Sequence, residues 1–308
     1  MAQATPVRRK GGILRWGALT PLVLALVFMI PVLLLQIYLT LHQWTAYLGP
    51  WWSANFVGLE VFWEALTDER FLWALVRSFI FAGLSTLLTL LLGFGLAHLL
   101  QKPFRGRALY YLVFIIPMLT VPVVIGFTFQ MLLYQDGPIN QMLSIFVPGD
   151  IRISWLGDPT AAFATMVLIE VWNWTPFVMI IILAGLVSLP KEPVEAAQVM
   201  GASRFQIFAH VTLPLLKPVL LLAIILRFLE ALAEFPKFWT ITQGGPGTAT
   251  ETIPIYLYLT AWEYANVSHA AAMSYIVLLL VGTIIYFAIR TLLRQKQSLD
   301  VMFAKTEG

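Results

Sequence analysis

Three charged side chains in an otherwise apolar segment are the first residues that suggest chemistry. Arg227, Glu230 and Glu234 lie between Pro218 and Pro236, three and four residues apart, so on a helix they form one stripe. A charge inside a membrane span costs roughly 2.5–3.5 kcal/mol on insertion scales and by default indicates function. Two interpretations stay open: a structural ion pair of Arg227 with Glu230 that locks two helices, or part of a solute path. We expect Glu234 near the outer interface, where its cost is small.

A second polar group interrupts the apolar run 159–190. It combines indoles, an amide and a hydroxyl with Pro176, which removes one helix hydrogen bond and frees a backbone carbonyl. Free backbone at membrane depth is tolerated where it is buried in protein or lines a wet cavity. Aromatic faces beside hydrogen-bonding groups suit a sugar-like solute, although the indoles are also typical of an interfacial aromatic belt. The candidate residues of the solute path are Trp172, Asn173, Thr175, Arg227 and Glu230, with Gln130 and Tyr134 from the kinked, proline-containing run before them.

The sequence offers no catalytic or metal site. It has no Cys, its four His are scattered, and no two His share a helical face at i and i+4. The stretch 243–248 contains several glycines but lacks the Gly-Lys-Ser/Thr ending of a phosphate loop, and Pro246 has no amide hydrogen to donate. We interpret this stretch as a tight outer turn, and we expect no catalytic residue, metal or cofactor on this chain.

These residues need a membrane to position them. Of the 308 residues, 59% are hydrophobic and 11% are charged, and the mean hydropathy is +0.82. A soluble domain has about 25% charged residues. The composition therefore excludes an ordinary soluble enzyme, a disordered chain and a nucleic-acid binder, despite a net charge of +3. It predicts an all-α integral membrane protein in a lipid bilayer.

Six transmembrane helices account best for the charges. The predicted spans are about 16–41, 78–101, 108–135, 160–189, 215–236 and 265–290, within a membrane domain 16–293 that has tails 1–15 and 294–308. With both termini in the cytoplasm, 14 Lys and Arg residues lie inside and 4 outside, as the positive-inside rule requires. The first apolar run is too long for a signal peptide, so we expect it to stay as a span. The acidic outer loop 43–77 is typical of interfacial structure.

The inside loop 191–214 has the signals of a helix–turn–helix. Pro193 suits a first helical turn, and Glu195 favours the positive end of the helix dipole. Ala196 and Ala197 give a small, smooth surface, and Gly201 is placed to end the helix. Ser203 and Gln206 have the spacing of a capping box for a second short helix, which we expect Leu213-Pro214 to end. A purely structural loop would not need two capped helices.

At these residues the chain resembles a known family. Glu195-Ala196-Ala197, then Gly201, then Val211-x-Leu213-Pro214 is similar to the EAA motif of permease subunits of binding-protein-dependent ABC importers, with Val211 where the motif has Ile. The resemblance implies that the hairpin is a coupling helix that docks into a cleft of an ATPase subunit. It implies coupling roles for Glu195, Ala196, Ala197, Gly201 and Ser203.

A second resemblance narrows the class. Thr242-x-Gly244-Gly245-Pro246, the run Thr250-Glu251-Thr252 and the run Ala270-Ala271-Ala272 look like the carbohydrate-uptake branch, with its first permease of the maltose and glycerol-3-phosphate type. The likeness covers roughly residues 20 to 293. Gln243 stands where Gly or another small residue is usual.

The family implies a complex in the cytoplasmic membrane of a bacterium or archaeon. Its partners are a second permease in a heterodimer, two ATPase subunits that bind ATP and Mg, an extracytoplasmic solute-binding protein, and a small-molecule sugar or polyol. We expect alternating access, in which ATP closes the ATPase dimer and draws the coupling hairpins together.

Three alternatives remain at this point. A secondary transporter would use Arg227, Glu230 and Glu170 as a proton relay but leaves the hairpin unexplained. An intramembrane enzyme would need a nucleophile, base or metal cluster that the sequence does not show. An ABC importer of a glycerol-phosphate-like or other polar solute would want more than one cation in the path, and Arg227 is the only basic candidate for the path.

Overall fold

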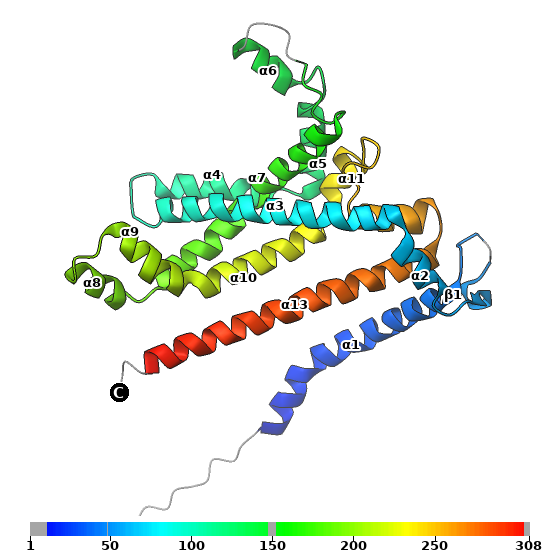
Figure 1. Cartoon of the computed structure of the whole chain (residues 1–308), viewed down its shortest axis with the longest axis horizontal. Helices are drawn as coiled ribbons and strands as arrows, with labels where there is room; N and C mark the ends of the chain where they lie inside the picture. The colour runs from blue at the N-terminus through cyan, green and yellow to red at the C-terminus, as the bar shows by residue number, and fades with distance from the viewer. Residues whose placement is uncertain (1–10, 48, 147–151, 305–308) are drawn as a thin grey trace, which may run out of the picture. The chain divides into compact units, whose positions relative to one another are not determined.

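The computed structural model describes residues 11–47, 49–146 and 152–304, with 11–19, 22 and 293–304 described by their backbone alone. Most of the predicted tail 1–15 and the last four residues of the tail 294–308 lie outside this range. In Figure 1 the chain runs from blue to red through helices joined by short connections. The long and medium helices are α1 (Gly11–Leu41), α2 (Glu60–Thr67), α3 (Glu69–Leu100), α4 (Arg107–Leu119), α5 (Pro122–Leu132), α6 (Pro138–Phe146), α7 (Pro159–Ser188), α8 (Glu192–Val199), α10 (Leu213–Leu232) and α13 (Val267–Ala304). The short ones are α9 (Arg204–Ile207), α11 (Pro236–Ile241) and α12 (Ile253–Tyr258).

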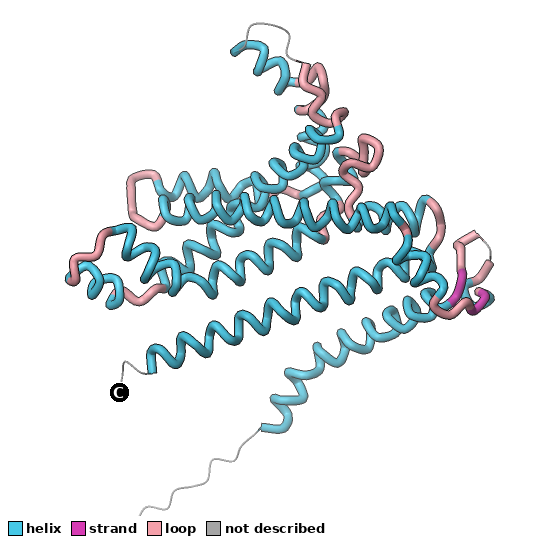
Figure 2. The backbone as a smooth tube through the Cα atoms, viewed as in Figure 1, coloured by secondary structure: helices cyan, strands magenta, loops and turns pink. Residues whose placement is uncertain are grey.

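The structure confirms the predicted all-α class. Helix dominates the tube in Figure 2, and the strands among the described residues are two residues long and lie in the outer loop. There β1 (His42–Gln43) pairs antiparallel with β2 (Asn55–Phe56), His42 opposite Phe56. This loop also contains α2, which buries Val61 and Ala65 and exposes its other face.

Five described helices are long and apolar enough to cross a membrane. They lie at Val23–Leu41, Glu69–Leu100, Pro159–Ser188, Arg204–Leu232 and Val267–Leu292. A sixth span arises if α4 and α5 are counted together, which agrees with the predicted six. The helix that contains the second predicted span begins at Glu69, because Asp68 caps it by accepting from the amides of Arg70 and Phe71 at 2.9 and 3.1 Å.

The predicted kink in the third span is a break. Helices α4 and α5 meet at 94°, at residues Thr120 and Val121. A residue before proline is pushed out of the helical region, and Val121, which precedes Pro122, has φ −62° and ψ 131°. Pro122 then starts α5, where a missing amide hydrogen costs nothing. In contrast, α7 continues through Pro176.

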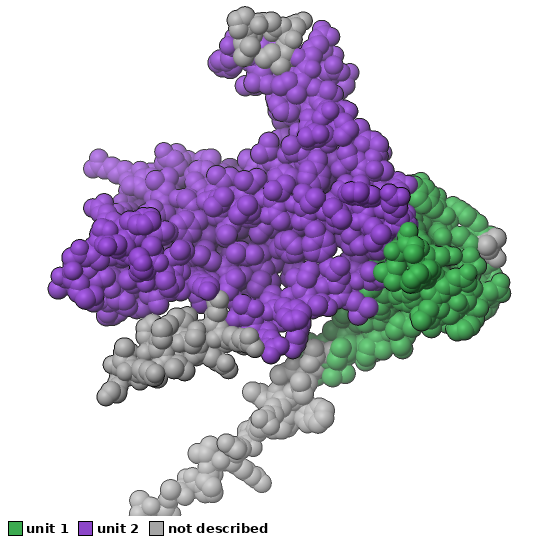
Figure 3. All heavy atoms as spheres, viewed as in Figure 1, with its two compact units in different colours: residues 1–67, 260–275 green, residues 68–259, 276–308 purple. Residues whose placement is uncertain are grey.

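The chain divides into two compact units, coloured green and purple in Figure 3. In the first, residues 1–67 and 260–275, the start of α13 is tied to the segment after α1, because the Trp44 amide donates to Ser268 Oγ at 2.9 Å. The second unit, residues 68–259 and 276–308, contains most of the helices.

Helix α7 is the centre of the second unit. It packs against α3, α4 and α10. The buried core at its N-terminal half joins Phe81 of α3, Met166 of α7 and Phe238 of α11. At Gly93 the helices α3 and α7 approach so closely that a Cβ atom would lie 2.9 Å from a Val178 methyl group and 3.0 Å from the Met179 amide nitrogen. Small residues permit such close packing, which drives helix association within lipid.

This close approach yields a test of the packing. We expect Gly93→Leu to force α3 away from α7 and to lower the yield of folded, monodisperse protein several-fold, measured by fluorescence-detected size exclusion. Gly95→Leu is the matched control, because nothing lies within 4 Å of a Cβ atom there. Equal losses in both variants would contradict the role assigned to Gly93.

Candidate functional site

A carboxylate buried in the middle of α7 organises the polar interior. Glu170 pairs with Arg227 of α10 and with Lys237 of α11, whose Nζ lies 2.6 Å from Glu170 Oε2. The side chains of Arg227, Lys237 and Glu170 are at most 1% exposed. Removing a single ion from water costs several kcal/mol even after relaxation, so each of these charges depends on its partners.

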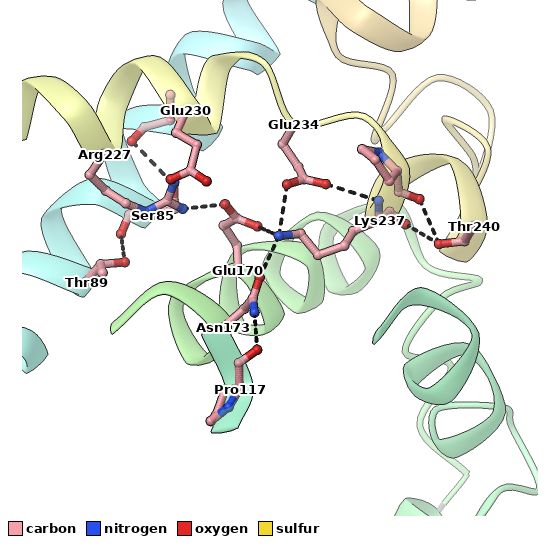
Figure 4. Close-up of polar contacts among 12 residues, drawn as sticks. Ser85, Thr89, Pro117, Glu170, Asn173, Arg227, Glu230, Glu234, Lys237 and Thr240 are labelled. Atoms are coloured by element: carbon pink, nitrogen blue, oxygen red, sulfur yellow. Dashed lines mark hydrogen bonds and ion pairs between the residues drawn. The ribbon is translucent and has the colours of Figure 1, made fainter. Parts of the chain in front are cut away.

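Lys237 extends the ion pair into a network. Its Nζ lies 2.9 Å from Glu234 Oε2 and donates to Asn173 Oδ1 at 2.9 Å. Asn173 Nδ2 donates to the Pro117 carbonyl at 2.6 Å. Figure 4 shows Lys237 directed between Glu170, Glu234 and Asn173, with Pro117 below the amide. The network therefore joins α7, α10 and α11 to the end of α4, next to the break before α5.

Glu230 is the accessible end of the network. Its carboxylate lies 3.5 Å from Arg227 Nη1, and 34% of its side chain is exposed. The indole of Trp174 lies beneath both cations, 5.5 Å from the Arg227 guanidinium carbon and 5.8 Å from Lys237 Nζ. Cation–π contacts strengthen where water is excluded, so Trp174 adds to the stabilisation of the two charges. Throughout the described chain, no group of three His, Cys, Asp or Glu residues could hold a metal ion.

The network corrects two sequence-based expectations. Lys237 is one of the four residues that the charge count places outside, yet it is one of the most buried side chains. Glu234, expected at the interface, is buried against it. The expected Arg227–Glu230 pair is present, yet Arg227 also pairs with Glu170. Glu234 and Lys237 are three residues apart in sequence, but they do not share a helix, because α10 ends at Leu232 and α11 begins at Pro236.

The predicted solute-path residues separate into two groups. Asn173 and Thr175 are buried, and the Thr175 hydroxyl donates to the Val171 carbonyl at 2.6 Å. Trp172 is 46% exposed, and its ring meets Phe129 of α5 edge to face at 5.3 Å. Gln130 and Tyr134 are exposed as well. Of the predicted path residues, Trp172, Gln130 and Tyr134 are exposed and Glu230 is partly exposed.

The predicted hairpin forms with its expected caps. Helix α8 ends before Gly201, whose φ of +81° favours glycine. Ser203 Oγ accepts from the Gln206 amide, and Gln206 Oε1 accepts from the Ser203 amide, which completes the capping box. Glu195 and Ala196 are exposed, whereas Ala197 is buried. A hollow of about 430 Å³ lies beside them, lined by Ala197, Met200, Gly201, Ala202, Gln206, Ile207, His210 and Val211.

The predicted end of the second hairpin helix is wrong. Helix α9 continues through a π-helical stretch, Phe208–Thr212, directly into α10. Leu213 and Pro214 start α10 and do not end a helix, because proline is tolerated in the first turn. One uninterrupted helical path therefore runs from the hairpin into α10, which contains Arg227.

The family pattern of the binding-protein-dependent transport system inner membrane components matches residues 89–298, which include the hairpin and the ion network. The chain belongs to this family. It is a multi-pass inner-membrane permease subunit of an ABC transporter.

Curated relatives and a solved structure agree with this membership. The permease is 35% identical over 82% of its length to the probable ABC transporter permease protein y4oQ of Sinorhizobium fredii, 81% of which is covered. It is 33% identical over 87% of its length to the trehalose/maltose transport system permease protein MalF of Thermococcus litoralis, 90% of which is covered. Its fold is similar to a chain of a bacterial ABC transporter involved in import of the acidic polysaccharide alginate, with a TM-score of 0.75, 23% identity, and 91% and 95% of the two chains covered.

The charge balance of the network predicts a rescue. Lys237→Met leaves the buried Glu234 carboxylate without its cation, and breaking a buried pair costs about 3–5 kcal/mol. We expect a marked loss of thermal stability of the purified permease. The double variant Lys237→Met/Glu234→Gln removes the stranded charge and should recover much of the loss. Additive destabilisation in the double variant would contradict the pairing.

Proposed function

We propose that this permease subunit takes up a sugar or polyol by alternating access, driven by ATP that partner subunits hydrolyse. The observation that carries the proposal is the doubly capped hairpin α8–α9, which presents Glu195 and Ala196 outward in a member of this family. The exposed hairpin suits docking by another protein, because its caps satisfy backbone groups at the helix ends while Glu195 and Ala196 stay exposed.

The proposed complex is a heterodimer with a second permease, two ATPase subunits and an extracytoplasmic solute-binding protein. ATP and Mg belong to the ATPase subunits, and we assign to this chain no catalytic residue and no cofactor. Both termini are proposed to lie in the cytoplasm of a bacterium or archaeon, on the hairpin side of the membrane. Nucleic acid has no place in this scheme.

The proposed solute class rests on the accessible group of path residues. The Trp172 ring offers an apolar face, and Gln130 and Tyr134 offer hydrogen bonds, which together suit hydroxyl-rich solutes. Arg227 is not the only cation available here, since Lys237 also pairs with Glu170. Both cations are nevertheless paired with carboxylates, which still favours a neutral solute. The names of the trehalose/maltose permease and of the alginate transporter support a carbohydrate.

The alternatives are weaker. A glycerol-phosphate-like solute would need a cation released from Glu170 or Glu234. Membership of the family opposes a proton-coupled secondary transporter. For a metal-dependent intramembrane enzyme, no group of three His, Cys, Asp or Glu among the described residues could hold the metal ion.

Charge reversal on the hairpin tests the coupling. Glu195→Lys should abolish most solute uptake and solute-stimulated ATP hydrolysis, because the exposed carboxylate is placed at the proposed docking face. Glu192→Lys, an exposed position in the first turn of the same helix, is the control and should retain most activity. Survival of both uptake and stimulation in Glu195→Lys would refute the docking role.

The proposed solute path predicts a loss of transport without loss of assembly. A sugar stacked on an aromatic face contributes on the order of 1 kcal/mol, so Trp172→Ala should lower the uptake rate about fivefold in vesicles. Trp63→Ala, at an exposed indole of α2, controls for the loss of a large exposed ring. Unchanged uptake in Trp172→Ala would remove this residue from the path.

A further inference from the structure

A long groove runs between α3 and α7, away from the ion network. Its volume is about 620 Å³. One wall is a stripe of α3 at spacings of three and four residues, and the other is a stripe of α7. The lining residues are Arg77, Ile80, Leu84, Leu88, Pro159, Thr160, Phe163, Ala164, Val167, Leu168 and Ala249. Apart from Arg77 and Thr160, all the lining side chains are apolar.

One end of the groove carries a cation and a hydroxyl. Arg77 Nε donates to the Glu251 carbonyl at 2.8 Å, whereas its Nη2 has no hydrogen bond and lies 3.7 Å from Glu251 Oε1. Both carboxylate oxygens of Glu251 accept from Arg70, Oε1 from Nε at 2.9 Å and Oε2 from Nη2 at 2.6 Å. The Glu251 carboxylate therefore hydrogen-bonds Arg70 and also forms an ion pair with Arg77, whose Nη2 is buried without a hydrogen bond and whose side chain is 17% exposed.

The same end contains the start of α7. The helix begins at Pro159, so the Thr160 amide belongs to the first turn, whose donors have no acceptor within the helix. Such a helix end favours anions. Asp158 competes for this end with its own carboxylate, which accepts from the Ala161 amide at 2.8 Å. Arg77 therefore supplies the charge that an anion needs, and Thr160 supplies additional donors.

The length of the groove matches half a bilayer. From Arg77 to Leu88 the helix rises about 16 Å at 1.5 Å per residue. The hydrocarbon core is about 30 Å thick, so one leaflet is about 15 Å deep. A lipid whose phosphate lies at Arg77 would therefore reach the end of the groove with one acyl chain near the middle of the membrane.

We propose that this groove binds an anionic phospholipid, with the phosphate at Arg77 and Thr160 and one acyl chain between α3 and α7. Within lipid, burial of apolar surface gives no preference for one chain over another. Selectivity among lipids therefore comes from the head group, and shape complementarity with the groove binds the acyl chain. An apolar transmembrane helix of another subunit would fill the apolar part but would bring no anion to Arg77 beyond Glu251.

Lipid retention tests the proposal on the full-length permease in its purified membrane complex. The complex is equilibrated in nanodiscs with equal amounts of phosphatidylglycerol and phosphatidylcholine that carry identical chains, and retained lipids are counted by native mass spectrometry. We expect wild-type protein to retain phosphatidylglycerol at least fivefold over phosphatidylcholine. Arg77→Gln should lose this preference, and Arg77→Lys should keep most of it.

A second variant tests whether the groove binds the acyl chain, and it leaves Arg77 and its contact with Glu251 unchanged. Ala164→Phe fills the groove and should abolish retention, whereas Val187→Phe, exposed on the same helix outside the groove, should not change it. Equal retention of the two lipids by wild-type protein, or an unchanged preference in Ala164→Phe, would overturn the proposal.

The permease has no native Cys, so Leu84→Cys gives a unique cross-linking site on this subunit. A cross-link from it to another subunit in the assembled complex would show that protein fills the groove and would also overturn the proposal.

Discussion

Two cations and two carboxylates must be held together in a region that offers them no water. Glu170 is paired with Arg227 and Lys237, and Lys237 is paired in turn with Glu234. None of these side chains is more than 8% exposed. Because an isolated buried ion is so costly, the helices that carry these residues have little freedom to separate. The arrangement of α7, α10 and α11 follows largely from this requirement.

The same network forms contacts beside two helix breaks, one between α10 and α11 and one between α4 and α5. The chain leaves α10 at Leu232 and restarts at Pro236, which brings Lys237 back toward α7. At the end of α4, the Asn173 side-chain amide donates a hydrogen bond to the Pro117 carbonyl, next to the break between α4 and α5. Irregular backbone at membrane depth is tolerated where it is buried in protein. Here the buried polar side chains supply the hydrogen bonds that make both breaks possible.

Continuity between α9 and α10 connects the two candidate sites. The hairpin residues and Arg227 lie on one helical path that passes through the π-helical stretch 208–212. Single π turns are frequent at functional sites. A rigid helix from the proposed docking face to the charged interior gives the proposed coupling a direct physical route. The groove between α3 and α7 lies outside this path, and its proposed lipid would act on the packing of the helices that flank it.

Local features of the chain were predictable from the sequence by itself. Membrane class and six spans follow from hydropathy and from the positive-inside count, since the bilayer acts on every residue of a span. The caps at Gly201 and Ser203 also follow, because each involves residues three or four positions apart. The family resemblance rested on the same short segment and was confirmed.

Tertiary structure alone decided how the charges are paired and which polar residues remain accessible. Lys237 was missed because its partners Glu170 and Asn173 are more than 60 residues away in the chain. Asn173 and Trp172 are neighbours in sequence, yet one is buried and the other exposed, since they lie on different faces of α7. Likewise, a proline ends a helix or begins one according to the backbone around it, as Pro122 and Pro214 begin helices here. These outcomes depend on which surfaces meet, and that is set by packing across the whole unit.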